Sequence, residues 1–337
     1  MKIKYIRILT FCIVFTFCVI SFQVGSKKTS NEISIKDDIS YLDDPTPPKQ
    51  PTDGPGGSNY SHFGVRKSRY GYGSNQYWIF EPYGPEPQSA PLIVFNHGWS
   101  AIFPIFYRAW INHLVKRGNI VIYPRYERGL YLGFNRFYEN AVDSIKDGIN
   151  TLQNGAHVQP ELDKFAIVGH SLGGEFTANM ASEAQDLGIP IPKAVMPVQP
   201  CLLGFEDVDF GDIPSETLML VVVGEDDTVV GIDPGRIIFE NSTQIPYVQK
   251  DYVVQVTDDY GTPDLIADHH SPVSMPFFDT VNAMDYYSTW KLFDALTDYA
   301  FFGINQEFCL GNTTQQRFMG LWSDGTPVKE LIITDNP

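Results

Sequence analysis

The feature of this sequence that most constrains its fold is a tight junction between a strand and a helix near the middle of the chain. A four-residue apolar run, 165–168, leads directly into Gly169-His170-Ser171-Leu172-Gly173, and a segment with helical periodicity follows. So short a turn brings strand and helix so close together that we expect only glycine to fit at positions 169 and 173. It also holds Ser171 in a strained backbone conformation. A junction of this kind is typical of a sheet that is covered by the helices following its strands.

The rest of the chain repeats this alternation of short apolar runs and longer amphipathic segments, which predicts an α/β fold with a mostly parallel central sheet and helices on both faces. Most of the expected strands are near-continuous apolar runs, as required where both faces of a sheet are covered. The expected strands are residues 76–81, 92–96, 120–124, 165–168, 194–198, 218–223 and 248–256. The expected helices are residues 104–117, 136–153, 172–187, 235–240 and 285–302. The stretch between 194–198 and 218–223 is short, so no large lid domain is expected.

Composition and charge limit the class of protein. Of the 337 residues, 43% are hydrophobic and 19% are charged, which is enough apolar surface to bury a large core. The formal net charge of -16, with no basic stripe outside the extreme N-terminus, argues against nucleic acid as a partner. Residues 26–59 are rich in Ser, Asp, Pro, Lys and Gly and are predicted to form a flexible linker. Residues 60–337 are then expected to form one folded domain.

The N-terminus carries an export or anchoring signal. Basic residues within the first seven positions precede an apolar run over residues 8–24. Its length lies between the roughly 7–15 apolar residues of a signal peptide and the about 20 of a membrane-spanning helix, so residues 1–25 are predicted to be one or the other. Both alternatives place the folded domain outside the cytoplasm, secreted or attached to a membrane. Two cysteines, Cys201 and Cys309, fall in that domain, either as a disulfide or as two buried thiols.

Ser171 is the candidate nucleophile, because the free N–H groups and the positive dipole end of the following helix face the reacting oxygen. A serine hydroxyl attacks only when a base takes its proton, and a carboxylate orients that base. After such a turn the acid precedes the histidine in the chain, and only His269 and His270 follow both Ser171 and a suitable acid. Adjacent side chains of an extended loop point in opposite directions, so one of the two faces Ser171. His269 is the preferred base and His270 the alternative.

The candidate acid lies just beyond the apolar run 218–223, which ends in Gly224-Glu225-Asp226-Asp227-Thr228. Asp227 is the preferred acid and Asp226 the alternative. A metal is not expected at Asp268-His269-His270, because the spaced His, Glu or Cys ligands of a zinc site are missing from this stretch.

Two backbone N–H groups are expected to bind the negative oxygen of a tetrahedral intermediate in an oxyanion hole. One belongs to Leu172, directly after the nucleophile, and the other to the loop His97-Gly98-Trp99-Ser100 after the strand 92–96. Trp99 is the preferred second donor and Ser100 the alternative, whereas His97 is expected to be structural. The aromatic residues Trp99, Phe103, Phe106 and Tyr107 either wall an apolar acyl pocket or fill the core.

These motifs together resemble the α/β-hydrolase superfamily over about residues 77–302, through Asn96-His97-Gly98-Trp99, Gly169-His170-Ser171-Leu172-Gly173-Gly174, Gly224-Glu225-Asp226-Asp227-Thr228 and Ala267-Asp268-His269. The Asp-Thr pair followed by two apolar residues is similar to the acid loop of many members. The lidless group of dienelactone hydrolases, cutinase- and polyester-hydrolase-like enzymes and chlorophyllase-like proteins is the most similar. Dienelactone hydrolases use a cysteine nucleophile, whereas a serine stands at position 171 here.

The resemblance implies a serine esterase that cleaves carboxylic esters through Ser171, Asp227 and His269, with Trp99 and Leu172 as the oxyanion hole. It implies no cofactor, and a small-molecule or polymeric ester as the substrate. A peptidase or an acyltransferase would use the same residues, and a non-catalytic surface binding protein would keep the same fold. These three remain alternatives.

Overall fold

The computed structural model describes residues 44–129, 134–204, 208–274 and 281–337. The expected signal or anchor, 1–25, and the first part of the expected linker, 26–43, lie outside the described residues. Within the described part of the chain, no helix combines the length and apolar character needed to span a bilayer.

A nine-stranded sheet forms the centre of the described structure, in the order β1-β2-β4-β3-β5-β6-β7-β8-β9. The strands are β1 (Gly64–Tyr70), β2 (Tyr77–Tyr83), β3 (Ser89–Asn96), β4 (Ile120–Pro124), β5 (Gln159–His170), β6 (Ala194–Val198), β7 (Leu218–Gly224), β8 (Lys250–Gln255) and β9 (Ile332–Thr334). The strands from β4 to β8 in this order are parallel, while β1, β2 and β9 pair antiparallel at the edges. The predicted mostly parallel α/β sheet is therefore confirmed.

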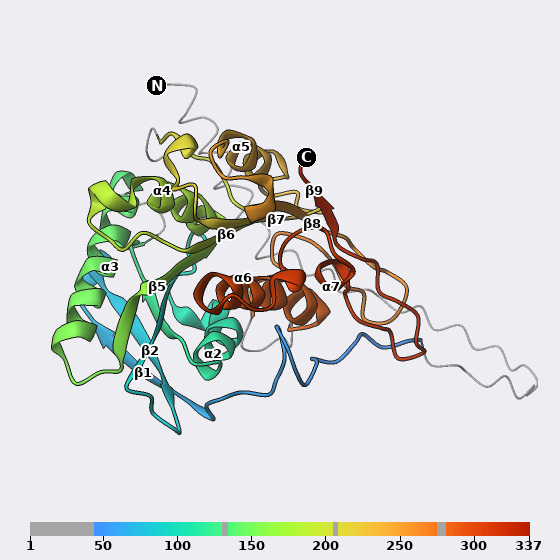
Figure 1. Cartoon of the computed structure of the whole chain (residues 1–337), viewed down its shortest axis with the longest axis horizontal. Helices are drawn as coiled ribbons and strands as arrows, with labels where there is room; N and C mark the ends of the chain where they lie inside the picture. The colour runs from blue at the N-terminus through green and yellow to red at the C-terminus, as the bar shows by residue number, and fades with distance from the viewer. Residues whose placement is uncertain (1–43, 130–133, 205–207, 275–280) are drawn as a thin grey trace, which may run out of the picture.

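Helices cover both faces of this sheet (Figure 1). One face carries α2 (Arg108–Lys116) and α6 (Trp290–Phe302). The other carries α3 (Phe137–Asn154), α4 (Leu172–Leu187) and α5 (Asp233–Asn241). The remaining helical segments are η1 (Gly73–Asn75), η2 (Pro104–Tyr107), η3 (Phe134–Arg136), η4 (Phe210–Asp212), η5 (Tyr247–Gln249), the π-helix η6 (Asp285–Thr289), η7 (Gln306–Phe308) and α7 (Thr314–Arg317).

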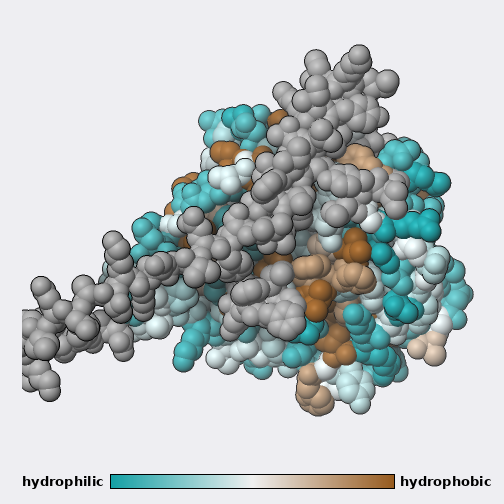
Figure 2. All heavy atoms as spheres, turned by 180° about the vertical axis from the view of Figure 1, so that it is seen from behind, coloured by the Kyte–Doolittle hydropathy of each residue, from teal (hydrophilic) through white to brown (hydrophobic). Residues whose placement is uncertain are grey.

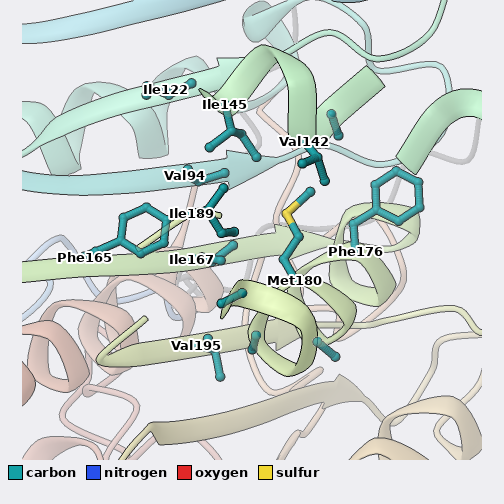
Figure 3. Packing of buried hydrophobic residues seen from close by; sticks show 14 of the residues in the cluster. Val94, Ile122, Val142, Ile145, Phe165, Ile167, Phe176, Met180, Ile189 and Val195 are labelled. Atoms are coloured by element: carbon teal, nitrogen blue, oxygen red, sulfur yellow. The ribbon is translucent and has the colours of Figure 1, made fainter. Parts of the chain in front are cut away.

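Two apolar cores result, one on each face of the sheet. Val94, Ile122 and Ile167 of three neighbouring strands pack against Ile145 of α3 and Met180 of α4 (Figure 3). Because side chains alternate along a strand, the residues on either side of Val94 belong to the opposite core, with α2 and α6. Burying one Val, Ile or Met side chain completely stabilises the folded state by roughly 1.5–3 kcal/mol, relative to leaving that side chain exposed.

The structure differs from the predicted elements mainly at their ends and at the sheet edges. The expected helix 104–117 begins as the 3-10 segment η2 before continuing as α2, and the expected helix 285–302 begins as a π-helix. The strands β1 and β9 were not predicted, because a half-exposed edge strand and a three-residue strand lack the continuous apolar run of a central one.

Residues 44–59, expected from composition to belong to a flexible linker, instead pack against the domain. The N–H of Gly56 donates to Asp294 Oδ2 at 2.7 Å, and the N–H of Thr46 donates to Ser323 Oγ at 2.9 Å. Residues 55–57 are buried. The folded unit therefore starts before residue 60. Amino-acid composition could not predict this, because the contacts are made by backbone N–H groups, which every residue except proline carries.

Cys201 and Cys309 are both free, buried thiols. Cys201 belongs to the core under α3, α4 and α5, whereas Cys309 belongs to the core on the opposite face of the sheet. Of the two alternatives for this pair, the structure therefore has the unbridged one.

Candidate active site

Ser171 lies at the turn between β5 and α4 with φ 57° and ψ -118°, a backbone conformation that residues other than glycine rarely adopt. A Cβ atom on Gly169 would lie 2.1 Å from the carbonyl oxygen of Gly173, and one on Gly173 would lie 2.2 Å from that of Asn96. Both distances are far inside van der Waals contact. These distances confirm the prediction that glycine is needed at positions 169 and 173. The close approach of strand and helix holds Ser171 at the start of α4.

Three side chains that are distant in sequence meet at the carboxyl ends of the parallel strands. The Nε2 atom of His269 lies 3.0 Å from Ser171 Oγ, and its Nδ1 atom lies 2.7 Å from Asp227 Oδ2. Ser171 follows β5, Asp227 follows β7 and His269 lies in the loop beyond β8. All three side chains are buried. The arrangement lets a serine pass its proton to a histidine that a carboxylate orients.

The neighbouring alternatives occupy different surroundings. His270 is exposed, and its ring is perpendicular to that of His269 at a centroid distance of 5.8 Å. Asp226 is also exposed, and its Oδ2 atom accepts the hydroxyl of Thr257 at 2.5 Å. The structure therefore brings Ser171 together with His269 and Asp227, the preferred residues of each pair.

Asp227 is held as a carboxylate. Its Oδ2 atom faces His269, and its Oδ1 atom accepts the N–H groups of Val229 at 2.9 Å and Val230 at 3.0 Å. Burial acts to raise the pKa of Asp227, but the hydrogen bond and charge of His269, with the two N–H groups, lower it below the ordinary value. A negative Asp227 keeps a hydrogen on Nδ1 of His269, which leaves Nε2 as an acceptor for the serine hydroxyl.

The expected oxyanion donors flank the serine. Leu172 is the first residue of α4, where a backbone N–H has no acceptor within the helix. On the other side, a Cβ atom on Gly98 would lie 3.3 Å from Ser171 Cβ, so the loop carrying Trp99 passes directly beside the nucleophile. Ser100, the alternative donor, gives its N–H to Glu127 Oε1 at 2.8 Å. The alternative donor, Ser100, is therefore already engaged by Glu127, and Trp99 stays the predicted second donor.

His97 and most of the nearby aromatic residues belong to the core. The ring of His97 is fully buried and stacks on Tyr126 at a centroid distance of 3.9 Å, and burial lowers its pKa to about 4. Trp99 and Tyr107 are also buried, whereas Phe103 is 49% exposed.

On the face opposite to Figure 1, hydrophobic residues gather in a band surrounded by hydrophilic ones (Figure 2).

Sequence reasoning missed the side chains that hold the loop of His269. Gln199 Nε2 donates to the carbonyl oxygen of Asp268 at 2.7 Å, and His170 Nε2 lies 2.9 Å from the carbonyl oxygen of His269. His170 stands inside the motif around Ser171, and Gln199 directly follows β6 at the same edge of the sheet. Their places beside the nucleophile and at the end of a strand were the sequence signals that could have pointed to a role at the site. Tyr107, which contacts His170, has no such signal.

A mostly parallel sheet with helices on both faces, a serine at the β5–α4 turn and partners after β7 and β8 is the arrangement of the α/β-hydrolase fold, as the resemblance of the sequence implies. Residues 76–203 match the family model described as Chlorophyllase, in agreement with the chlorophyllase-like resemblance. This match supports an esterase-type hydrolase. The matched stretch includes Ser171 and ends before Asp227 and His269. A comparison with curated proteins found no match.

Proposed function

We propose that the protein hydrolyses carboxylic esters through a triad of Ser171, His269 and Asp227, with a covalent acyl-enzyme intermediate. The observation that carries this proposal is the pair of buried hydrogen bonds, 3.0 Å from His269 to Ser171 and 2.7 Å from His269 to Asp227. The match of residues 76–203 to the chlorophyllase model supports an ester as the substrate class.

In the acylation step, Ser171 Oγ attacks the ester carbonyl carbon while its proton passes to His269 Nε2. The carbonyl oxygen becomes an oxyanion, which the N–H groups of Leu172 and Trp99 bind; one such donor contributes about 2.7–4 kcal/mol to transition-state stability. The imidazolium of His269 is stabilised by the carboxylate of Asp227. When the tetrahedral intermediate collapses, the bond to the alcohol oxygen breaks and His269 returns the proton to the leaving alkoxide.

In the deacylation step, His269 takes a proton from a water molecule, whose oxygen attacks the acyl carbon. The second tetrahedral intermediate expels Ser171 Oγ, and His269 gives the proton back to it. The products are a carboxylic acid and an alcohol. Water, the three triad side chains and the two backbone N–H groups take part in these steps.

The proposal extends to the setting of the reaction. The N-terminal run 8–24 supports an enzyme that is secreted or attached to a membrane with its catalytic domain outside the cytoplasm. The short segment between β6 and β7 supports an open site for a small-molecule or polymeric ester. Fractionation of cells that express the full chain tests the location: activity confined to the cytoplasm would contradict it.

The triad is tested by labelling with a fluorophosphonate probe and by hydrolysis of p-nitrophenyl acetate. We expect Ser171→Ala to abolish labelling and His269→Ala to lower kcat by a factor on the order of 10⁶, the loss that such groups cause when they act as a unit. His270→Ala and Asp226→Asn are matched controls and should retain activity. Labelling that persists in Ser171→Ala, or equal losses in the two histidine variants, would overturn the proposal.

A further inference from the structure

We propose that Tyr107 and His170 are positioning residues that tie the oxyanion loop to the loop that carries His269. The inference rests on the proposed function for its catalytic consequence. The structural observation is a chain of three buried hydrogen bonds that leads from Gly98 to the backbone of His269 beside Ser171. The side chains of Asp227 and His269 are not part of this chain.

The three hydrogen bonds follow one another without a gap. The N–H of Gly98 donates to Tyr107 Oη at 3.0 Å. Tyr107 Oη lies 2.7 Å from His170 Nδ1, and His170 Nε2 lies 2.9 Å from the carbonyl oxygen of His269. The first of these residues immediately precedes Trp99, and the last is the base itself. One path therefore connects both sides of the reacting serine.

The far end of this chain determines where each hydrogen lies. The carbonyl oxygen of His269 can only accept, so His170 Nε2 carries a hydrogen. A neutral imidazole has one N–H, which makes Nδ1 an acceptor that takes the hydroxyl hydrogen of Tyr107. Tyr107 Oη in turn accepts from Gly98, so all three hydrogen bonds run in the same direction.

The surroundings of His170 keep its ring neutral. Burial, followed by the charges of His269 and His270, holds the pKa of His170 well below its usual value. Burial likewise raises the pKa of Tyr107 far above the working range, so its hydroxyl keeps its hydrogen. A second hydrogen on Nδ1 of His170 would face the Tyr107 oxygen and disrupt the single direction of the chain.

A neutral His170 also suits the proposed reaction. Its ring centroid lies 4.7 Å from that of His269, which becomes positively charged while it holds the serine proton. A positive His170 at this distance would repel the imidazolium that the reaction forms. The pair of positioning residues therefore restrains the base through its backbone and adds no positive charge beside its ring.

Tyr107→Phe tests the inference with the smallest change. It leaves Gly98 N–H and His170 Nδ1 without their partner, and a displaced base loop should lower kcat for p-nitrophenyl acetate by about 10-fold to 100-fold. We expect KM to change less than about twofold, because substrate contacts are not removed. Tyr77→Phe is the control: it deletes a partly buried tyrosine hydroxyl, bonded to Asp147 and Thr151, and should leave kcat unchanged.

A conservative pair of variants separates positioning from packing. His170→Gln keeps a donor for the carbonyl oxygen of His269 and an acceptor for Tyr107, whereas His170→Leu keeps neither. We expect the glutamine variant to retain at least tenfold more activity than the leucine variant. Equal activities of these two folded variants, or unchanged kcat in Tyr107→Phe, would overturn the inference.

The tautomer of His170 gives a readout that does not depend on catalysis or on a folded variant. In the full chain labelled with ¹⁵N-histidine, we expect the His170 signals to show hydrogen on Nε2 and none on Nδ1 at neutral pH. Hydrogen on Nδ1 would refute the directed chain even in an active enzyme. Conversely, the expected tautomer without fluorophosphonate labelling of Ser171 would refute the proposed function and leave the hydrogen-bond chain intact.

Discussion

At the scale of single residues, Glu127 is a buried carboxyl group that contacts the loop predicted to form the oxyanion hole. Its Oε1 atom accepts the N–H of Ser100 at 2.8 Å, and its Oε2 atom has no hydrogen-bond partner among the described residues. Burial raises the pKa of Glu127 from 4.5 to about 8, although the N–H of Ser100 and the charge of Arg125 act in the opposite direction. Glu127 is therefore a neutral carboxylic acid at pH 7, next to an equally neutral His97 whose Nδ1 lies 3.8 Å from Oε1.

A pH-dependent stability follows from this raised pKa. Between pH 4.5 and about 8 the folded state keeps the proton of Glu127 and the unfolded state loses it, so this group's contribution is complete below pH 4.5 and decreases as the pH rises toward 8. The loss is about 1.4 kcal/mol per pH unit within that window. Glu127→Gln keeps an acceptor for Ser100 and has no proton to lose.

The free energy of unfolding, measured with urea at several pH values for both proteins, checks this expectation. The difference between wild type and Glu127→Gln should become smaller or change sign as the pH rises, in favour of the variant. Other buried acids, such as Asp285 and Asp251, are common to both proteins and cancel in the difference. A difference that is constant from pH 5 to 8 would show that Glu127 is ionised throughout.

At the scale of secondary-structure elements, the sequence predicts best where an element is buried along its whole length. The strand β6 has the predicted bounds because it is a fully buried apolar run. The helix α4 also has the predicted bounds, because it begins at the turn of Ser171 and ends at Gly188, which is in the left-handed conformation. The edge strands β1 and β9 gave no such signal. Ser171 was also identifiable locally, since glycine is required on both sides of it within one turn.

The partners of Ser171 were only partly predictable, because they depend on how separate elements meet. Chain order reduced the bases to His269 and His270, but which of the two faces the serine depends on the path of a loop beyond β8. Tyr107 and His170 are 63 positions apart in the sequence, so no local pattern could reveal their hydrogen bond. This contact depends on how η2, which ends at Tyr107, lies against the end of β5, whose last residue is His170.

The end of β7 shows how closely the elements around the site approach one another. A Cβ atom on Gly224 would lie 2.3 Å from the carbonyl oxygen of Ala267 and 2.8 Å from Gln199 Nε2. Gly224 is three residues before Asp227, and Ala267 is two before His269. A side chain at position 224 would therefore push the acid loop away from the base loop.

We expect Gly224→Ala to lower kcat for p-nitrophenyl acetate by about 100-fold, because a displacement near 1 Å at reacting groups has an effect of that order. The free energy of unfolding should fall by about 1–3 kcal/mol from overpacking. Gly129→Ala is the control, since its Cβ would meet no atom of the described residues within 4 Å. If Gly224→Ala loses stability but keeps kcat, the acid and base loops move together, and the 2.7 Å bond between His269 and Asp227 survives the change.

At the scale of the whole molecule, a buried ionic cluster joins the N-terminal segment to two helices. Asp294 of α6 accepts the N–H of Gly56 at 2.7 Å and contacts His113 Nε2 at 2.8 Å and Arg117 Nε at 3.2 Å, both from the α2 side. Figure 1 shows the segment running past α6 to β1. Burial acts to raise the pKa of Asp294, but Arg117 and His113 lower it below its ordinary value, so its contribution to stability is present above about pH 4 and is lost in acid.

Asp294→Asn removes the negative charge at the centre of this cluster. Breaking a buried ion pair from one side costs about 3–5 kcal/mol, and we expect about 3 kcal/mol, because Arg117 keeps its contact with Asp298 at 3.0 Å. Urea unfolding measures the loss. Asp233→Asn is the matched control, since it removes an exposed ion pair with Arg236 and should have no measurable effect.

The docking of the segment itself has a separate signature in limited digestion with trypsin. Lys49 is exposed, but its neighbour Pro48 is buried, so cleavage after Lys49 requires the segment to leave the domain. Asp294→Asn should accelerate this cleavage because it weakens the acceptor of Gly56. Gly56→Ala, whose Cβ would lie 2.0 Å from the carbonyl oxygen of Tyr286, should accelerate it while leaving His113 and Arg117 paired with Asp294. If only Asp294→Asn accelerates cleavage, the cluster acts through the packing of α2 on α6; if both do, the docking of Gly56 against the domain holds the N-terminal segment in place.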